Sequence, residues 1–239
     1  PVIKTNAQCD IAIVGGGMVG ISLALALQSA LPAASIVLLE GMSQPRSALD
    51  QPLPQPSFDA RSTAISRSSV AIFEHLGLWS ALAPHACGIE TIHVSAQGRF
   101  GSAMLHASDH SWPALGYVIE NGVLGVSLLK ALLRSSVTLR DGLRVQGLAL
   151  GADAVTLTLQ EQDSQQQLRC RLLVLADGAH STLRDRLGIA VQHKDYRQHA
   201  LIANVAFAEA HGGCAWERFT PTGPLAMLPL LASSVDEHR

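Results

Sequence analysis

The sequence predicts an α/β protein with two sheets, and three observations lead to this fold class. An apolar, β-branched run at 10–14, a segment of helical composition at 17–29 and a second apolar run at 35–39 have the order of a βαβ unit. Three strand-like runs between residues 137 and 160 follow one another with Gly and Asp at their turns, which predicts an interleaved β-meander. Strand-like runs elsewhere in the chain predict a second sheet of mixed strand directions.

Length and composition place the chain among globular proteins. With 239 residues it is long enough for one or two domains, and 48% hydrophobic against 15% charged residues excludes a disordered chain. The formal net charge is -2, without runs of Lys or Arg, so a protein that binds nucleic acid through charge is disfavoured. Aromatic residues make up only 4% of the chain, which also disfavours binding of single strands by base stacking.

The cysteine spacing and one uncharged segment indicate which metal sites and which cellular location to expect. The four cysteines form no CxxC pair, so we expect neither a metal site nor a disulfide framework. Free cysteines are typical of a reducing environment, so we expect a cytoplasmic location. The polar start of the chain does not have the pattern of a secretory leader. Residues 11–39 carry no charge, but the consecutive glycines from Gly15 and the later Pro32 would break a membrane-spanning helix, so we expect no span.

The rest of the chain shows further helical and strand patterns. The expected helices cover residues 66–76, 78–83 and 122–134, the last with Asn121 as its cap. The expected strands cover residues 91–96, pieces of 102–119, 168–176, 196–207, 216–220 and 225–228. Residues 41–58 contain four prolines and are expected to form an irregular loop.

Two discontinuous domains follow from this order of elements. We expect residues 1–90 and 120–190 to form a nucleotide-binding domain, because they contain the βαβ unit, the meander and the motifs described next. Residues 91–119 and 191–239 then supply the second, mixed sheet, which is expected to form the floor of a substrate pocket.

The strongest local motif is the GxGxxG sequence GGGMVG at residues 15–20, between the first expected strand and helix. Gly15 permits the tight turn, Gly17 lets a pyrophosphate approach the backbone, and Gly20 lets the helix and the strand pack closely. The free amide groups at the start of the helix face the same anion. A glycine-rich turn without a nucleotide is the alternative interpretation.

An acidic residue completes the nucleotide-binding pattern. Glu40 ends the second expected strand, about 20 residues beyond the glycine motif, where a carboxylate can accept hydrogen bonds from ribose hydroxyls. The same acid would repel the extra phosphate of an NADP-type ribose, so the tightly bound nucleotide is expected to be FAD or NAD.

A second turn motif follows the apolar strand at 168–176. Residues 177–184 read DGAHSTLR, so an Asp-Gly turn leads into a helix that Ser181 can cap. Such a turn places the carboxylate of Asp177 and the helix amides at a sheet edge. A plain β-turn followed by a capped helix is the alternative interpretation.

An arginine follows the proline-rich loop. Arg61 stands in the segment DARSTAI at residues 59–65, where its guanidinium could clamp a phosphate through two parallel hydrogen bonds. An ordinary surface arginine is the alternative.

Together these motifs resemble the FAD-dependent aromatic hydroxylases of the para-hydroxybenzoate hydroxylase type. The resemblance rests on AIVGGGMVG with the distal Glu40, on DARSTAIS and on ADGAHSTLR. The segments ERFT at 217–220 and GPLAMLP at 223–229 are similar to one subgroup, the ubiquinone-biosynthesis hydroxylases of the 2-octaprenyl-6-methoxyphenol hydroxylase kind. The resemblance spans essentially the whole chain and implies a Rossmann-like FAD-binding domain beside a substrate domain.

The resemblance also implies a cofactor set and a reaction. FAD is the bound cofactor, NAD(P)H the transient reductant and dioxygen the co-substrate; reduced flavin adds dioxygen at C4a, and the hydroperoxide hydroxylates a phenol ring. The FAD-binding residues implied are Gly15, Gly17 and Gly20 for the pyrophosphate, Glu40 for the ribose, Arg61 for a phosphate or the ribitol, Val145 for the adenine through its backbone, and Asp177 for the flavin-facing loop. The pattern assigns no catalytic residue and no general base.

A polyprenylated phenol is the substrate that the resemblance implies. Such a molecule partitions into lipid, so we expect peripheral contact with the inner membrane, and other ubiquinone-biosynthesis proteins as possible partners. A third FAD motif, typical of the family, has no match after Gly223, so the chain is expected to be a C-terminally truncated enzyme with impaired flavin retention and activity. Another FAD-dependent oxidoreductase and a non-catalytic scaffold subunit of a quinone-biosynthesis complex are the alternatives that stay open.

Overall fold

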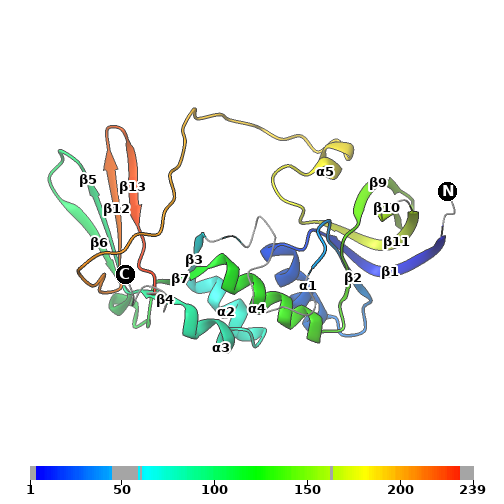
Figure 1. The fold of residues 1–239 in the computed structure, drawn as a ribbon, viewed down its shortest axis with the longest axis horizontal. Coiled ribbons are helices and arrows are strands. Elements are labelled where there is room, and N and C mark those ends of the chain that lie inside the picture. The colour runs from blue at the N-terminus through cyan, green and yellow to red at the C-terminus, as the bar shows by residue number, and fades with distance from the viewer. Residues whose placement is uncertain (1–3, 45–58, 60, 162–163, 232–239) are drawn as a thin grey trace. The chain divides into compact units, whose positions relative to one another are not determined.

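The structure is a computed structural model, and it describes residues 4–44, 59, 61–161 and 164–231. The chain divides into two compact units, Pro1–Asp59 with Gly125–Leu201 and Ala60–Leu124 with Ile202–Arg239 (Figure 1). The loop expected at 41–58 lies mostly outside the described residues. The expected division into a nucleotide-binding and a substrate domain stays a prediction, because compactness does not show what either unit binds.

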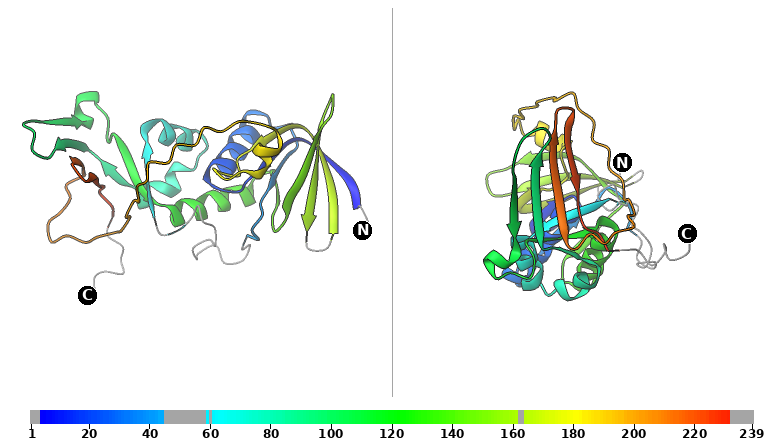
Figure 2. Two further views of the ribbon diagram at one scale, coloured as in Figure 1. Left: turned by 90° about the horizontal axis from the view of Figure 1, so that it is seen from above. Right: turned by 90° about the vertical axis from the view of Figure 1, so that its left-hand side faces the viewer.

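A six-stranded sheet with the order β8-β2-β1-β11-β10-β9 forms the first unit (Figure 2). Its strands are β1 (Lys4–Val14), β2 (Ile36–Leu39), β8 (Thr138–Arg140), β9 (Arg144–Leu150), β10 (Val155–Glu161) and β11 (Ser164–Leu175). The strands β8, β2, β1 and β11 run parallel, whereas β11, β10 and β9 form an antiparallel meander. The expected α/β fold with its βαβ unit is confirmed. The expected meander of 137–140, 143–150 and 154–160 is wrong in one strand, because β8 pairs parallel with β2 and the third strand of the meander is β11.

Helix α1 (Met18–Ala30) connects β1 to β2 and packs against both strands. Successive side chains of β1 point to opposite faces of the sheet, and Ala12 and Ile13 are both fully buried, as is Leu38 on β2. On one face Ala12 packs in a cluster with Leu157 and with other apolar residues of the meander. Burial on both faces explains why the sequence is an uninterrupted apolar run here rather than an alternating one.

Two strands are longer than the sequence pattern predicted. We expected β1 to begin near Asp10 and β11 near Leu168, but the structure starts them at Lys4 and at Ser164. Most of the added residues are polar, and they are held by strand pairing: Gln166 pairs with Leu159 on one side and with Lys4 on the other. Backbone hydrogen bonds with neighbouring strands can extend a strand into residues whose own sequence has no apolar pattern.

The second unit contains two sheets, of order β13-β12-β5-β6 and β3-β7-β4. Their strands are β3 (Ser62–Ser66), β4 (Cys87–Ile89), β5 (Thr91–Ala96), β6 (Ser102–His106), β7 (Gly116–Glu120), β12 (Cys214–Thr220) and β13 (Gly223–Met227). Strand β12 pairs parallel with β5 and antiparallel with β13, so the larger sheet is mixed, as expected. The segment 102–119 contributes one strand to each sheet, because β6 pairs with β5 whereas β7 pairs with β3 and β4.

The remaining helices lie close to the expected positions. They are α2 (Arg67–His75), α3 (Trp79–Leu82), η2 (Ala83–His85), η3 (Ala107–His110), α4 (Asn121–Arg134) and α5 (Thr182–Arg186). Asn121 was expected to cap α4 from outside, but the helix already includes it, and its side-chain oxygen accepts a hydrogen bond from Thr63 at 2.5 Å. Across the described ranges no helix is long and apolar enough to cross a membrane.

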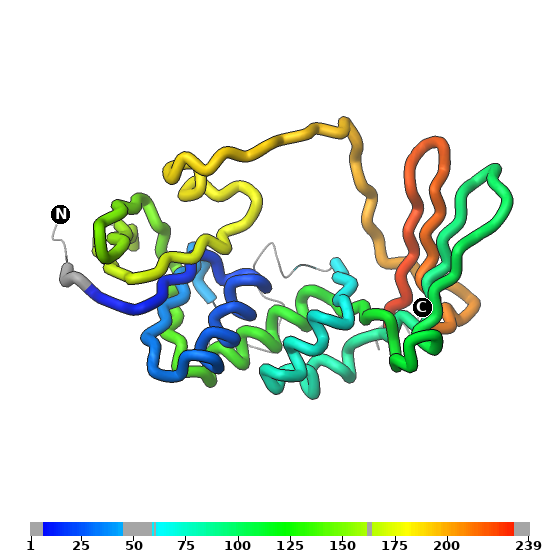
Figure 3. The backbone as a smooth tube through the Cα atoms, turned by 180° about the vertical axis from the view of Figure 1, so that it is seen from behind, coloured from blue at the N-terminus to red at the C-terminus, as the bar shows by residue number. Residues whose placement is uncertain are grey.

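One expected strand is wrong. We expected residues 196–207 to form a strand, but they form no regular element, as the backbone tube in Figure 3 shows. Their apolar side chains lack cover: Leu201 is fully exposed and Phe207 is mostly exposed. An apolar run becomes a strand only where another strand accepts its backbone hydrogen bonds.

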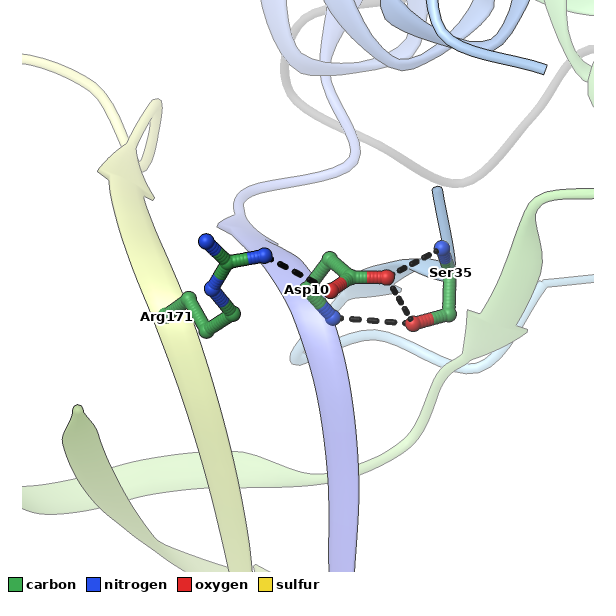
Figure 4. A network of polar contacts seen from close by, with 3 residues as sticks. All are labelled: Asp10, Ser35 and Arg171. Carbon is green, nitrogen blue, oxygen red and sulfur yellow. Dashed lines mark hydrogen bonds and ion pairs between the residues drawn. The ribbon is translucent and has the colours of Figure 1, made fainter. Parts of the chain in front are cut away.

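A polar network joins the start of β2 to the middle of β1 and β11 (Figure 4). The Asp10 carboxylate accepts hydrogen bonds from the Ser35 backbone amide at 2.9 Å and from the Ser35 hydroxyl at 2.8 Å. Arg171 on β11 lies 3.5 Å from the other carboxylate oxygen. The hydrogen bonds from Ser35, followed by the nearby Arg171 guanidinium, lower the pKa of Asp10.

We predict that Asp10→Asn lowers the stability of the protein at pH 7 and flattens its acid dependence. Because the pKa of Asp10 is lower in the folded chain than the unfolded value of about 3.9, its contribution is complete above that pH and is lost as the pH falls further. The urea midpoint, followed by circular dichroism, should differ between variant and parent at pH 7, and the difference should shrink as the pH falls below about 3.9. Asp153→Asn, in the exposed β9–β10 turn, is the control and should leave both midpoints unchanged.

Candidate functional site

Three of the expected site residues come together at one edge of the first sheet, where β1, β2 and β11 end. Val14, Leu39 and Leu175 are the last residues of these parallel strands, and Val14 pairs with both of the others. Gly15 and Glu40 directly follow the first two strands, while Asp177 follows the third after one residue. Ligands of open α/β sheets bind at the carboxyl ends of the strands, so this edge is the candidate site.

Backbone contacts fix the glycine-rich turn against its neighbours. The Gly15 amide donates to the Leu39 carbonyl at 2.8 Å, and Gly15 has a φ of +109°, which favours glycine. A Cβ atom on Gly15 would lie 2.3 Å from the Ala176 carbonyl oxygen. A Cβ atom on Gly20 would lie only 1.8 Å from the Gly15 carbonyl oxygen. Side chains at these two positions are therefore excluded by neighbouring backbone.

The start of α1 offers free amide groups at the same edge. Gly17 precedes the helix in an extended conformation, and the first bond of the helix runs from the Ile21 amide to the Gly17 carbonyl at 3.0 Å. The first amides of a helix have no partner within it and carry partial positive charge. The described first turn of α1 carries no acidic side chain that would compete for them. This arrangement fits the pyrophosphate of a dinucleotide.

The Glu40 carboxylate lies between the glycine-rich turn and the residues after β2. Its Oε2 atom accepts a hydrogen bond from the Gly16 amide at 2.7 Å, and its Oε1 atom accepts one from the Met42 amide at 2.8 Å. A carboxylate has about four lone-pair positions, so both oxygens can still accept from a sugar hydroxyl. Glu40 was expected to end the second strand, and the structure places it directly after β2; its bond to the Gly16 amide was not foreseen.

Val145 stands on β9 beside an irregular step. It pairs with Leu159, whereas Gly147 pairs with Thr158, so Gln146 is the additional residue of a β-bulge. The Val145 side chain packs on the core of the sheet, so any contact of Val145 with a ligand would have to use its backbone. Nearby on the chain, the Leu143 amide donates to the Glu40 carbonyl at 3.3 Å. The segment before Val145 is thus tied to the Glu40 side of the site.

The loop after β11 is shaped by its own motif. Gly178 has a φ of +88°, and the Ser181 hydroxyl accepts from the Arg184 amide at 3.1 Å, which confirms the expected cap of α5. Sequence reasoning gave Arg184 no role, although DGxxSxxR contains it. Its guanidinium Nη1 donates to the Ala179 carbonyl at 3.0 Å and so holds the loop that Asp177 begins.

Arg61 belongs to the second compact unit. It immediately precedes β3, its side chain is exposed, and its carbonyl accepts the Asn121 amide at 2.8 Å. Its expected role on a phosphate or on the ribitol therefore stays a prediction.

The paired cysteines in the middle of β1 and β11 are packing groups. Cys9 and Cys170 are buried partners on β1 and β11, and all four cysteines are free thiols. Burial, with the adjacent Cys170, raises the pKa of Cys9 to about 12. A thiol with such a pKa stays protonated at neutral pH, so it is not a nucleophile there.

Comparison with protein families identifies the class. Residues 8–230 match the FAD binding domain family, so the chain belongs to that family. This confirms the resemblance drawn from the motifs, and FAD as the cofactor of the family.

Individual relatives are named for ubiquinone biosynthesis. The chain is 34% identical over 229 residues to ubiquinone hydroxylase UbiL of Rhodospirillum rubrum, covering 95% of this chain and 50% of that protein. It is 34% identical over 227 residues to 3-demethoxyubiquinol 3-hydroxylase of Escherichia coli, covering 95% and 56%. The ubiquinone biosynthesis monooxygenase COQ6 of Caenorhabditis elegans is 28% identical over 235 residues. The chain spans about half the length of these relatives.

Solved structures support the same fold. The anhydrotetracycline hydroxylase OxyS of Streptomyces rimosus superimposes with a TM-score of 0.60 at 25% identity, over 79% of this chain and 35% of that one. The flavin-dependent monooxygenase PieE, solved with FAD and substrate, gives a TM-score of 0.65 over 100% of this chain and 46% of its own, at 16% identity. At that identity the likeness shows the fold alone, which is Rossmann-like.

We predict that Gly20→Ala destabilises the first unit strongly. The new Cβ atom would lie 1.8 Å from the Gly15 carbonyl oxygen, so α1 must move away from the sheet. The loss in the free energy of unfolding should reach or exceed the upper end of the ~1–3 kcal/mol typical of overpacked cores. Urea unfolding measures it.

Gly88→Ala on β4 is the matched control for this substitution. Its Cβ atom would lie 3.5 Å from the Ala114 Cβ, an ordinary contact. A change within about 0.5 kcal/mol is therefore expected. Equal effects of the two substitutions would contradict the close packing of α1 on the turn.

Proposed function

We propose that this chain belongs to an FAD-dependent monooxygenase that hydroxylates a polyprenylated phenol in ubiquinone biosynthesis, with NAD(P)H and dioxygen. The observation that carries the proposal is the meeting of the glycine-rich turn, Glu40 and the Asp177 loop at one sheet edge. The names of the relatives supply the reaction and the substrate class.

The residues of the first unit fit FAD from the pyrophosphate outward. The assignments are Gly15, Gly17 and Gly20 to the pyrophosphate, Glu40 to the adenosine ribose, Val145 to the adenine, Asp177 to the flavin-facing loop and, from the second unit, Arg61 to a phosphate or the ribitol. The excluded side chains at Gly15 and Gly20 support the tight turn and the close packing of α1, which direct the first amides of the helix to the proposed pyrophosphate position. The negative charge of Glu40 favours a ribose without an additional phosphate.

The protein's part in the reaction is to bind, orient and exclude water. FAD, when bound, supplies the redox chemistry of oxygen transfer. The first amides of α1 would neutralise the diphosphate, and the loop begun by Asp177 is held by Arg184 through the Ala179 carbonyl. A rigid loop beside the cofactor limits the access of water to the reacting atoms.

The second unit is proposed to bind the substrate, through residues 91–119 and 191–239. Its mixed sheet exposes large apolar side chains, among them Trp216, Phe219 and Leu225. An apolar surface suits a prenylated ring, and the lipid solubility of such a substrate favours peripheral contact with the inner membrane.

Two alternatives are separated from this proposal by experiment. Another FAD-dependent oxidoreductase would bind FAD but would not consume oxygen with a prenylated phenol. A scaffold subunit of a quinone-biosynthesis complex would keep its function without the proposed contact between Glu40 and the adenosine ribose. Unchanged quinone production in cells that carry Glu40→Ala in the full-length gene would favour the scaffold.

We predict that the purified chain, mixed with FAD, binds it and shows the absorbance bands of a flavoprotein. The full-length protein should then consume oxygen with reduced pyridine nucleotide, and faster when a short-chain prenylated phenol is added. Spectral titration and an oxygen electrode measure the two effects. Absence of flavin binding by both proteins would remove the proposal, while flavin binding without stimulation by the phenol would favour another oxidoreductase.

We predict that Arg61→Ala weakens FAD binding without unfolding the protein. Loss of one charge-assisted hydrogen bond to a phosphate is worth ~1.5–3 kcal/mol, which raises the dissociation constant by roughly tenfold to a hundredfold. Fluorescence titration with FAD measures it. Arg99→Ala, also exposed in the second unit, is the control and should bind FAD as the parent does.

A further inference from the structure

Gly16 occupies a position that the GxGxxG motif leaves open, yet it is in close contact with Glu40. A Cβ atom on Gly16 would lie 2.9 Å from Glu40 Oε2 and 3.1 Å from both Cβ and Cγ of that side chain. Real Cβ atoms essentially never approach closer than 3.0 Å, so an alanine here would displace the carboxylate. The Glu40 side chain therefore gives a physical reason for a glycine at this position.

The contact is also a hydrogen bond, and it is one of a pair. Glu40 Oε2 accepts from the Gly16 amide at 2.7 Å, and Oε1 accepts from the Met42 amide at 2.8 Å. Charged acceptors make short bonds that are stronger than neutral ones. The carboxylate thus connects the middle of the glycine-rich turn to the backbone after β2 without any ligand.

We propose that Glu40 is a positioning residue that holds the glycine-rich turn in its anion-binding conformation before the nucleotide binds. Because Gly16 has no side chain, it leaves the space that the Glu40 carboxylate occupies. As far as FAD is concerned, this rests on the proposed function. The carboxylate keeps lone pairs for ribose hydroxyls, so one side chain serves both the ribose and the turn beneath the pyrophosphate. A turn that is already ordered binds its anion without the entropic cost of ordering.

This role differs from that of a simple ribose ligand in one measurable respect. A residue that only accepts from ribose hydroxyls has no effect on a nucleotide without them. A residue that orders the turn affects every diphosphate that binds there. The pair ADP and 2′,3′-dideoxy-ADP separates the two roles, because the analogue keeps the diphosphate and lacks both hydroxyls.

The first measurement needs no nucleotide. Amide hydrogen exchange of the full chain, followed by NMR, should show Gly16 and Met42 protected in the parent and at least about tenfold less protected in Glu40→Ala. Glu40→Gln should keep only one of the two protected amides, because its amide group has a single acceptor oxygen. Glu161→Ala is the control, since the Glu161 carboxylate accepts from Gln166 at 2.9 Å at the β10–β11 end of the sheet.

The second measurement is binding. Glu40→Ala and Gly16→Ala should each raise the dissociation constant for 2′,3′-dideoxy-ADP by roughly tenfold or more. The urea midpoint of each variant should stay close to that of the parent. Unchanged affinity for the dideoxy analogue in Glu40→Ala, or an unprotected Gly16 amide in the parent, would overturn the proposal. If the parent binds neither FAD nor ADP, the proposed function fails on its own, and the exchange experiment alone still decides the role of Glu40.

Discussion

The parallel pairing of β1 with β11 is the constraint on which the candidate site depends. The two strands are far apart in sequence, yet Val14 pairs with Leu175, so the chain leaves both strands at the same edge of the sheet. Gly15 then passes so close to Ala176 that only hydrogen fits in place of a Cβ atom. The conformation of the turn is set by the neighbouring strand as well as by the glycines in it.

Two carboxylates fix β2 at its opposite ends. Asp10 holds the start of the strand through Ser35, whereas Glu40, just after its last residue, holds the glycine-rich turn through Gly16. Both accept hydrogen bonds from backbone amides, which are strong because the acceptor is charged and the donor is fixed. A strand of only four residues, Ile36–Leu39, is thereby placed accurately beside β1.

The features that sequence reasoning found are those with local physical causes. The cap of α5 by Ser181, the turn at Gly178 and the start of α1 after Gly17 each depend on residues within one turn of chain. The features that it missed depend on partners. The polar start of β11 is a strand because β1 and β10 form hydrogen bonds with it. Residues 196–207 form no strand, although we expected one there.

The sequence by itself determined the order of elements, the nucleotide-binding motifs and the family, because glycine positions, apolar runs and cap residues follow from local sterics and hydrogen bonding. Only the tertiary structure decided which strands pair, and hence that Glu40 reaches the Gly16 amide and that Gly15 lies against Ala176. The physical reason is that these contacts span chain separations over which no local pattern acts. They exist because the backbone hydrogen bonds of a sheet align the ends of strands from distant segments.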